Sequence, residues 1–288
     1  MQIAAASNLV CPIDGSELAR RGAALVCGRG HSFDVAREGH CNLLLVQHKA
    51  SRDPGDSKAM VAARRRFLDA GYFAPIAERL FADVRALAAN LPEARECTLL
   101  DAGCGEGYYL DRLCRLATQC PDPLPLRLAG IDVSKWAVQA AARRKLPVAW
   151  LVASNALPPF SAGSVDLILC LFGFPAWHGF KKVQQAGACV VLVDPGPDHL
   201  LELRQIIYPS VTRSEPPSLA KAEAAGYGLE REDVLRFPIA LDSTARIQDL
   251  LAMTPHAHRL PAAGRAALAR LERLDVTVEV VVRVLRLG

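Results

Sequence analysis

The sequence lacks any apolar run that approaches the roughly 18 residues of a membrane-spanning helix. Its first ten residues, MQIAAASNLV, have no basic start followed by an apolar core, so they do not resemble a signal peptide. No internal repeat or low-complexity tract is present. With 51% hydrophobic and 22% charged residues among 288, the composition is that of a globular protein with one large domain and a small one. We therefore expect a cytoplasmic protein with no membrane partner.

The number of cysteines is odd: the sequence has nine, scattered through segments with strand-like or helical periodicity. In a chain of this length without a secretion signal, reduced thiols and metal ligands are more common than a disulfide framework. We therefore expect no disulfide network and look for metal ligands among the cysteines.

Charge of one sign is in small excess, with a net charge of +4. Residues 1–80 contain 11 Lys and Arg against 8 Asp and Glu, whereas residues 81–288 contain 23 against 22. The N-terminal excess centres on residues 48–52 (HKASR) and 63–67 (ARRRF). Such stretches can bind a phosphate backbone or form the solvated face of a helix, and charge alone does not separate the two interpretations.

Strands alternate with helices from residue 97 onward, which predicts an α/β fold with a parallel, doubly wound sheet. The expected strands are residues 97–103, 126–134, 148–154, 165–173 and 188–194, and the expected helices are residues 108–117 and 135–145. Two late strands, 235–241 and 276–285, flank a helix at 244–253. Late closing strands are typical of the seven-stranded, Rossmann-like sheet of class I methyltransferases.

The chain before this sheet divides into two regions. Residues 1–45 are glycine-dotted and poor in regular periodicity, whereas residues 57–90 are mostly helical with a break at Pro75. Residues 48–57 form the expected linker, because they are charged and contain a Pro-Gly turn. We predict three parts: a small module at 1–45, a basic linker with helices at 46–92, and the Rossmann-like domain at 93–288.

The most informative chemical motif is LLDAGCGEGYYLD at residues 99–111. Asp101 ends a strand and is followed by Gly103, Gly105 and Gly107, which permit positive φ and close approach of the backbone to a ligand. The dinucleotide motif is usually G-x-G-x-x-G, with its third glycine one residue later. The acid before the loop does not favour a pyrophosphate, but it suits S-adenosylmethionine, whose amino-acid end carries an ammonium group. A dinucleotide site and a vestigial site remain the alternatives.

Two further residues follow the next strands. Asp132 ends the second strand, where a carboxylate can accept hydrogen bonds from both ribose hydroxyls. Asn155 follows the third strand and can contact the adenine edge or be an ordinary loop amide. Together with Asp101 and the glycine loop, Asp132 indicates S-adenosylmethionine as the cofactor.

The segment after the fourth strand bears on the methyl acceptor. Adenine-N6 enzymes of this fold carry (N/D)-P-P-(F/Y) there, and this chain has LFGFPAW at 171–177. Cytosine-C5 enzymes use a cysteine, commonly after proline, whereas Cys170 follows no proline and suits a buried position in the strand. The segment thus argues against both reactions without indicating another.

Several blocks together resemble one family, the 23S rRNA (guanine-N1)-methyltransferases, over nearly the whole chain. The blocks are residues 31–60, 63–75, 100–109, 194–203 and 250–259. The stretch QHKASRDPGDS is more similar to the RlmA-like branch that methylates the Gram-negative target guanine than to the branch linked to macrolide resistance. The resemblance implies methyl transfer from S-adenosylmethionine to guanine N1 in a 23S rRNA hairpin.

The resemblance also implies cofactor contacts outside the glycine loop. It assigns them to Phe73, Tyr109, Leu110 and His199. Because Phe73 precedes the sheet, the helices before the sheet would fold over the cofactor. Without the resemblance, Phe73 could belong to the core and His199 to the surface.

The resemblance implies a zinc-ribbon-like N-terminal module that helps to bind RNA through a Cys-x-x-Cys … Cys-x-x-x-His site. Cys11, Cys27 and His31 keep their places, and Asp14 replaces the second cysteine. A carboxylate can ligate zinc, although structural sites usually use sulfur and nitrogen. The alternative is a metal-free module held by apolar packing. A substitute ligand from residues 40–41 (His-Cys) would require a different fold.

The acceptor pocket is expected at residues 171–179, where Phe172, Phe174, Trp177 and His178 can surround an unstacked base. Candidates for the proton acceptor are His178, Asp194 and His199, and solvent is a further one. This chain departs from the family here, since it has Phe-Gly-Phe-Pro at residues 172–175 and QQAGA at 184–188.

Besides 23S rRNA, a second copy of the chain, in a homodimer, is a candidate partner. The alternatives to the guanine-N1 enzyme are a methyltransferase for another RNA nucleotide, an RNA-binding or assembly protein that holds S-adenosylmethionine with little turnover, and a small-molecule methyltransferase. The N-terminal block argues against the last, because a small acceptor needs no module for gripping RNA.

Overall fold

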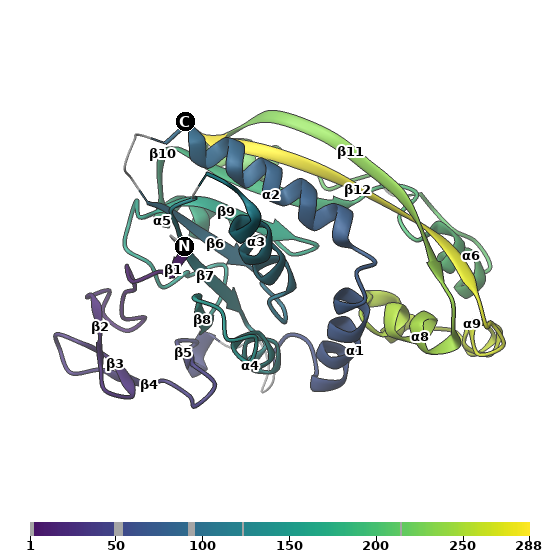
Figure 1. Ribbon diagram of the computed structural model, residues 1–288, viewed down its shortest axis with the longest axis horizontal. Coiled ribbons are helices and arrows are strands. Elements are labelled where there is room, and N and C mark those ends of the chain that lie inside the picture. The colour runs from purple at the N-terminus through teal and green to yellow at the C-terminus, as the bar shows by residue number, and fades with distance from the viewer. Residues whose placement is uncertain (1–2, 49–53, 92–95, 123, 214) are drawn as a thin grey trace.

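The computed structural model describes residues 3–48, 54–91, 96–122, 124–213 and 215–288. A nine-stranded mixed sheet forms its centre, with the order β11-β12-β10-β9-β6-β7-β8-β5, and β1 pairs beside β7 (Figure 1). The strands of this sheet are β1 Ile3–Ala5, β5 His40–Asn42, β6 Cys97–Ala102, β7 Leu126–Asp132, β8 Ala149–Val152, β9 Val165–Leu171, β10 Gln184–Pro195, β11 Tyr227–Leu241 and β12 Leu274–Leu287. Pairing is parallel from β10 to β5, and β12 runs antiparallel to both β10 and β11.

This order confirms the expected class I methyltransferase fold, and two short strands enlarge the sheet. Seven strands, β6 to β12, follow the predicted arrangement, including the two late strands that close it. β1 and β5 come from the N-terminal region and were not expected there, because three-residue strands carry no periodicity. β11 begins at residue 227, whereas the sequence predicted a start at 235. The first half of the strand is mostly exposed and polar, so it lacks the apolar residues that would have indicated a strand.

Alternate side chains of the central strands point to opposite faces of the sheet, and helices cover the apolar side chains on both faces. In β6, Leu99 belongs to the apolar layer beneath α2, α3 and α4, whereas Leu100 belongs to the opposite layer with α5 and α7. Burial of each such leucine stabilises the fold by roughly 1.5–3 kcal/mol. The helices are α2 Ala74–Ala89, α3 Tyr108–Gln119, α4 Lys135–Ala142, α5 Trp177–Val183 and α7 Ala220–Ala224.

The remaining helices lie at the ends of the long strands. The α1 helix, Lys58–Asp69, contacts α8, Thr244–Ala252, although 174 residues lie between their nearest ends (Figure 1). α6 (Leu201–Ile207) and α9 (Ala262–Leu268) pack beside them, and the 3₁₀ turns are η1 (Val46–His48) and η2 (Pro255–Arg259). Ser57, Ser134 and Ser243 cap α1, α4 and α8 with their hydroxyl oxygens, which satisfies N–H groups at the helix starts.

The N-terminal region contains a separate three-stranded sheet, formed by β2 Leu18–Arg21, β3 Ala24–Cys27 and β4 Ser32–Asp34. An isolated bridge joins Val35 to Cys41 in β5, and β5 pairs with β8. The two sheets are therefore linked by backbone pairing. Most of the predicted linker, residues 49–53, lies outside the described residues, and the division into three domains stays a prediction.

Candidate functional site

The carboxyl ends of four neighbouring strands bring the predicted acidic residues to one edge. Asp101 lies near the end of β6, Asp132 ends β7, and Asp194 lies in β10. The order β10-β9-β6-β7 places these ends in a row. In doubly wound sheets ligands bind at this edge, where the strand order reverses on either side of the first strand.

The glycine loop after β6 uses its glycines for two purposes. Gly103, Gly105 and Gly107 have φ values of 92°, 55° and 82°, a region that disfavours other residues. A Cβ on Gly107 would lie 2.8 Å from the Trp150 ring and 2.9 Å from Ala141 Cβ, so this glycine lets α3 pack against α4 and β8. A Cβ on Gly103 would meet nothing within 4 Å among the described residues, which leaves backbone open to a ligand.

Asp101 is buried, and its Oδ2 has no hydrogen-bond partner among the described residues. Burial, together with the nearby charge of Asp132, raises the pKa of Asp101 to about 8. A buried carboxylate oxygen without a partner is destabilising, and a ligand that offers a positive hydrogen-bond donor relieves this. The ammonium group of S-adenosylmethionine is such a donor.

Asp132 is held by the backbone on both sides. Its Oδ2 accepts a hydrogen bond from the Gly105 N–H at 3.0 Å, and its Oδ1 accepts one from the Ser134 N–H at 2.8 Å. Each carboxylate oxygen retains a second lone pair, so the group is oriented and can still accept from ribose hydroxyls. Burial raises its pKa, and these two hydrogen bonds oppose that rise.

The segment just before α1 packs against the turn that follows Asp132. A Cβ on Gly55 would lie 2.9 Å from Ser134 Cβ, and the Ser134 hydroxyl donates to the Asp56 carbonyl at 2.7 Å. Asp56 forms an ion pair with Arg64, whose side chain lies 3.8 Å from the Cβ position of Gly105. The sequence analysis did not predict that residues 54–57 pack against this part of the site. The Pro-Gly-Asp-Ser stretch at these positions was the feature that could have indicated it.

Three aromatic rings meet beside this edge. The Phe73 ring centroid lies 6.0 Å from that of Phe172 and 6.3 Å from that of His199, and the latter two are 5.8 Å apart. Phe172 follows β9 with a φ of 52°, and it is 37% exposed. A positive φ in a phenylalanine is uncommon, and such strain clusters at functional sites.

His199 has a fixed hydrogen-bonding arrangement. Its Nδ1 lies 2.9 Å from the Glu279 carbonyl oxygen, which can only accept, so Nδ1 carries the proton and Nε2 is left as an acceptor. Burial lowers the pKa of His199 to about 4, and the hydrogen bond to Glu279 only partly opposes this. The ring is therefore neutral near pH 7.

The other predicted residues lie in different surroundings. Tyr109 is half-buried at the start of α3, whereas Leu110 is fully buried in the core layer beneath the helices, and its predicted contact with the cofactor stays a prediction. Asn155 Nδ2 donates to the Phe174 carbonyl at 3.3 Å, which joins the loops after β8 and β9. Within the part of the chain that the structure describes, the exposed His178 has no hydrogen bond or ring contact with the aromatic group.

Asp194 and Trp177 are held by neighbours of their own. Asp194 is buried, and its Oδ2 lies 3.8 Å from a guanidinium nitrogen of Arg283. Burial raises the pKa of Asp194, and the positive charge of Arg283 opposes that rise. The Trp177 ring lies 5.1 Å from Tyr227 and 6.1 Å from Phe180, in the apolar layer of α5. The structure thus brings together Phe73, Phe172 and His199.

These observations test the fit of S-adenosylmethionine. The open Gly103 backbone, the unpartnered oxygen of Asp101 and the oriented carboxylate of Asp132 offer complementary groups for its amino-acid end and its ribose. The fit is therefore good.

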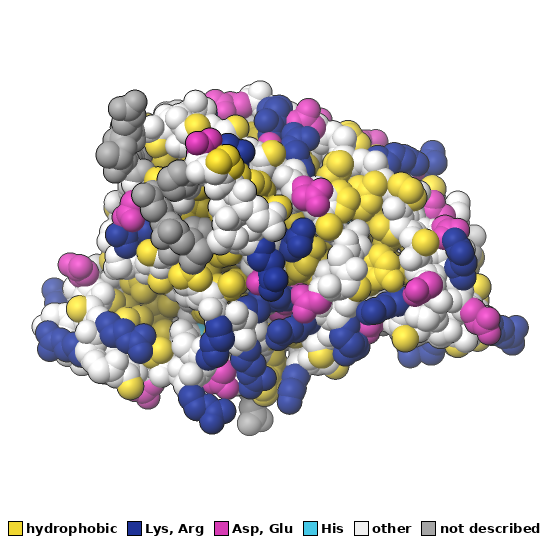
Figure 2. All heavy atoms as spheres, in the orientation of Figure 1, with side chains coloured by type: hydrophobic (Ala, Val, Ile, Leu, Met, Phe, Trp, Pro, Cys, Tyr) yellow, Lys and Arg dark blue, Asp and Glu magenta, His cyan; other side chains and the backbone are white. Residues whose placement is uncertain are grey.

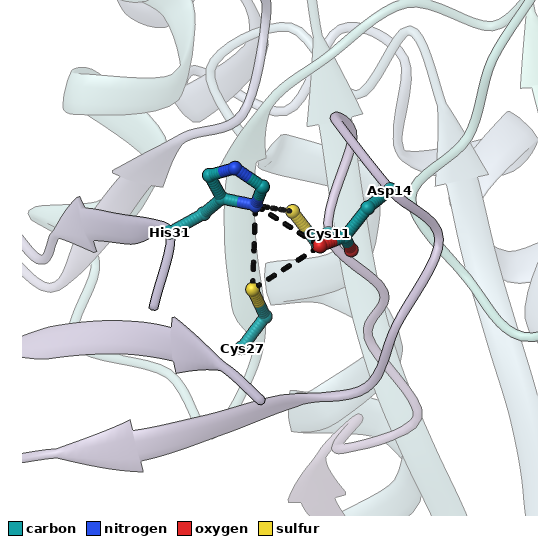
Figure 3. A group of neighbouring side chains, drawn as sticks. All are labelled: Cys11, Asp14, Cys27 and His31. Atoms are coloured by element: carbon teal, nitrogen blue, oxygen red, sulfur yellow. Dashed lines mark hydrogen bonds and ion pairs between the residues drawn. The ribbon is translucent and has the colours of Figure 1, made fainter. Parts of the chain in front are cut away.

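A second group of functional side chains lies in the N-terminal region. The potential ligand atoms of Cys11, Asp14, Cys27 and His31 all lie within 4.8 Å of one another, and the four side chains point toward a common centre (Figure 3). His31 Nδ1 lies 3.0 Å from Asp14 Oδ2, 3.5 Å from Cys11 Sγ and 3.4 Å from Cys27 Sγ. Tetrahedral zinc with ligands at about 2.0–2.3 Å separates its ligand atoms by roughly 3.3–3.8 Å. The distances from His31 to the two thiols lie in this range and that to Asp14 is shorter, and a set of two thiols, one imidazole and one carboxylate suits zinc.

Asp14 is well prepared for a cation. Its Oδ1 accepts hydrogen bonds from the Ser16 N–H at 2.9 Å and the Ser16 hydroxyl at 2.6 Å, which leaves Oδ2 facing the thiols. These bonds hold the pKa of Asp14 far below its ordinary value. Burial raises the pKa of the Cys27 thiol, but hydrogen bonds, first that of Ser16, outweigh this and lower it to about 7. Such orienting partners are typical of metal sites.

The two residues considered as substitute ligands lie elsewhere. His40 and Cys41 belong to β5, and the Cys41 thiol lies 3.7 Å from the Phe33 carbonyl. Neither is in the four-residue group. The metal site therefore needs no contribution from β5.

Comparisons with known proteins agree with both sites. Residues 9–52 match the zinc-ribbon family described as "RlmA, N-terminal", and residues 99–196 match "Methyltransferase domain". The Bacillus subtilis (strain 168) protein named "Putative 23S rRNA (guanine-N(1)-)-methyltransferase YxjB" is 31% identical over 94% of this chain and 94% of its own length. The Streptomyces fradiae protein named "23S rRNA (guanine(748)-N(1))-methyltransferase" is 32% identical over 96% of each.

These matches confirm the predicted cofactor and the predicted zinc ribbon. No helix among the described residues is long and apolar enough to cross a bilayer. The main domain is an S-adenosylmethionine-dependent methyltransferase domain, and the module before it is a zinc ribbon whose four ligands suit zinc. Since the similarity to both relatives extends over more than nine-tenths of each chain, this protein belongs to the 23S rRNA (guanine-N1)-methyltransferase family.

Proposed function

We propose that this enzyme transfers a methyl group from S-adenosylmethionine to N1 of a guanine in a 23S rRNA hairpin. The observation that carries the proposal is the group of three rings, Phe73, Phe172 and His199, beside the unpartnered Asp101. Phe172, the exposed ring of the group, offers an aromatic face for an unstacked base, and its neighbour Gly173 adjoins Ala102 at the end of β6. Family membership supplies the substrate class, and an rRNA substrate favours a cytoplasmic location.

The proposed binding roles follow from the donors and acceptors. S-adenosylmethionine, when bound, supplies an electrophilic methyl group. Asp101 pairs with the ammonium group, and Asp132 accepts from the ribose hydroxyls. Phe73 from the helices before the sheet and Tyr109 from α3 enclose the cofactor, and Asn155 flanks the adenine side. Orientation of the reacting atoms is the main contribution of these residues.

Guanine N1 carries a proton at neutral pH, and this proton must leave before the lone pair can attack. His199 Nε2 is an acceptor beside the aromatic group, because Nδ1 is committed to Glu279. Burial lowers its pKa to about 4, so His199 is a weak base and solvent is the final acceptor of the proton. This geometry favours His199 over the exposed His178 and over Asp194, which faces Arg283.

The test is direct. Incubation with labelled S-adenosylmethionine and unmodified 23S rRNA, followed by digestion to nucleosides, should place label in 1-methylguanosine. Label on another base would refute the guanine assignment, and salt-sensitive RNA binding without transfer would favour an RNA-binding protein with little turnover. Mapping the modified position would also decide between the two branches of the family, and the homodimer stays a prediction.

A further inference from the structure

A hollow of about 430 Å³ lies beside the cofactor site, between three helices. Arginines dominate its lining: Arg65 from α1, Arg112 and Arg115 from α3, and Arg143 and Arg144 after α4. Figure 2 shows Lys and Arg side chains gathered over α1, α3 and α4. We call this site the arginine hollow. Arg65 belongs to the basic stretch 63–67, and the sequence motifs assigned no role to the other four arginines.

The base of the arginine hollow is fixed by a buried ion-pair network. The Arg144 side chain is 5% exposed, and its Nε donates to the Glu106 carbonyl at 2.8 Å. Arg144 also pairs with the Glu106 carboxylate, with Asp69 at 2.8 Å and with Asp111 at 3.6 Å. This arginine is therefore neutralised by its neighbours and serves as a rigid floor rather than as a free cation.

Two donors that line the arginine hollow have no hydrogen-bond partner among the described residues. They are the Tyr108 hydroxyl, on a side chain that is only 3% exposed, and Arg112 Nε. Burial raises the pKa of Tyr108 to about 12, so the hydroxyl keeps its proton and can donate. Unpaired buried donors are rare in folded proteins, and two in one hollow indicate an absent acceptor.

The rim adds mobile positive charge. Arg65, Arg115 and Arg143 are 39%, 65% and 53% exposed, and they pair with Asp69, Asp111 and Glu38 respectively. Exposed ion pairs of this kind are weak, so these arginines can turn to another anion. The lining itself holds five arginines against two aspartates, and three glutamates outside the lining each pair with one of these arginines: Glu106 with Arg144, Glu38 with Arg143 and Glu78 with Arg112.

We propose that the arginine hollow binds a backbone phosphate of the RNA substrate near the target nucleotide. Tyr108 and Arg112 would donate to the phosphate oxygens, and the rim arginines would neutralise its charge. The location suits this role, since Tyr108 adjoins Tyr109 and Gly71 lies two residues before Phe73. The inference rests on the proposed function, because it takes RNA as the substrate.

The experiment measures binding of an unmodified 23S rRNA hairpin by fluorescence anisotropy across a salt series. Tyr108→Phe removes only the unpartnered hydroxyl and should weaken binding about threefold to tenfold while leaving the melting temperature equal or higher. Arg112→Gln should weaken binding about tenfold and reduce the slope of log K against log salt by about one. Calorimetry with S-adenosylmethionine should give wild-type affinity for both variants.

The matched control is Arg273→Gln, which removes one exposed arginine that lies outside the lining of the arginine hollow. Wild-type RNA affinity in Tyr108→Phe and Arg112→Gln, with guanine methylation intact, would overturn this inference alone. An equal loss in the control would reduce the effect to general charge and would also overturn it. Failure of the wild-type protein to bind or methylate the RNA would overturn the proposed function together with the inference.

A final arm separates RNA phosphate from free phosphate. Inorganic phosphate is titrated into the wild-type protein and into Tyr108→Phe, with the melting temperature as the readout. Stabilisation at millimolar phosphate that Tyr108→Phe abolishes, combined with unchanged RNA affinity in that variant, would assign the hollow to a free anion and reject the RNA assignment.

Discussion

Two aspartates in this protein lie at proposed cation sites, and the protein shifts their pKa values in opposite directions. Asp14, in the zinc ribbon, accepts two hydrogen bonds from Ser16, and its pKa is held far below the ordinary value. Asp101, at the edge of the large sheet, is buried with an unpartnered oxygen, and its pKa is raised to about 8. Asp14 is thus kept ionised by the protein, whereas Asp101 is left for its ligand to ionise.

The difference separates a structural cation from a substrate-like one. A site for a resident metal benefits from a permanent anion, because the metal stays with the fold. A site for a cofactor that enters and leaves at each turnover can remain incomplete, because the fold need not depend on it.

Loss of a thiolate at the zinc ribbon should have the largest effect. Cys27→Ala leaves three ligands, so bound zinc should fall from about one ion per chain to below about a tenth after dialysis against a weak chelator. Elemental analysis by mass spectrometry measures this. Cys41→Ala is the matched control, since Cys41 is also a buried cysteine of this region but lies outside the group. Full zinc in Cys27→Ala would show that the ligands are different.

Neutralising Asp101 should weaken cofactor binding. Asp101→Asn keeps the shape but loses the charge that faces the ammonium group, so the Kd for S-adenosylmethionine should rise about 10- to 100-fold. Isothermal titration calorimetry gives this value. Asp166→Asn is the control, because Asp166 is also buried but accepts from the Thr98 N–H at 2.9 Å. Equal affinity in Asp101→Asn and the wild type would remove Asp101 from the site.

Replacing Asp14 by cysteine should strengthen zinc binding at the zinc ribbon. Asp14→Cys supplies a third thiolate, a softer ligand, so zinc should resist removal by a competing chelator about tenfold better. Asp14→Asn, which removes the anion, should shift the competition in the opposite direction. A chelator midpoint that neither substitution changes would mean that Asp14 does not ligate the metal.

The smallest predicted effect concerns pH. Burial raises the pKa of Asp101 from an unfolded value near 4 to about 8, so between these values the folded chain binds a proton that the unfolded chain has lost. The free energy of unfolding of the cofactor-free protein therefore falls as pH rises through this window. Asp101→Asn removes this loss.

Calorimetric melting at two pH values tests that sign. The melting temperature of Asp101→Asn minus that of the wild type should be greater at pH 9 than at pH 5, by about a few degrees. An identical difference at both pH values would contradict the raised pKa.

Periodicity and motif spacing predicted most of the large sheet and the glycine loop, because long apolar strands and positive-φ glycines leave local signals. Strands β1 and β5 could not be predicted, since three residues show no period and their pairing depends on distant β7 and β8. The family resemblance indicated Phe73 and His199 although they lie far apart in sequence. The arginine hollow was indicated only by the basic stretch 63–67, which contains Arg65, because its other arginines come from α3 and from the residues after α4, with ordinary surface spacing.

The pairing of β5 with β8 has a consequence for substrate choice. Because backbone hydrogen bonds connect the zinc ribbon to the large sheet through β5, the separation between the metal and the methyl-transfer point is set by the fold. For an RNA hairpin that contacts both places, the length of the stem between the two contacts would therefore help to determine which nucleotide reaches the methyl group.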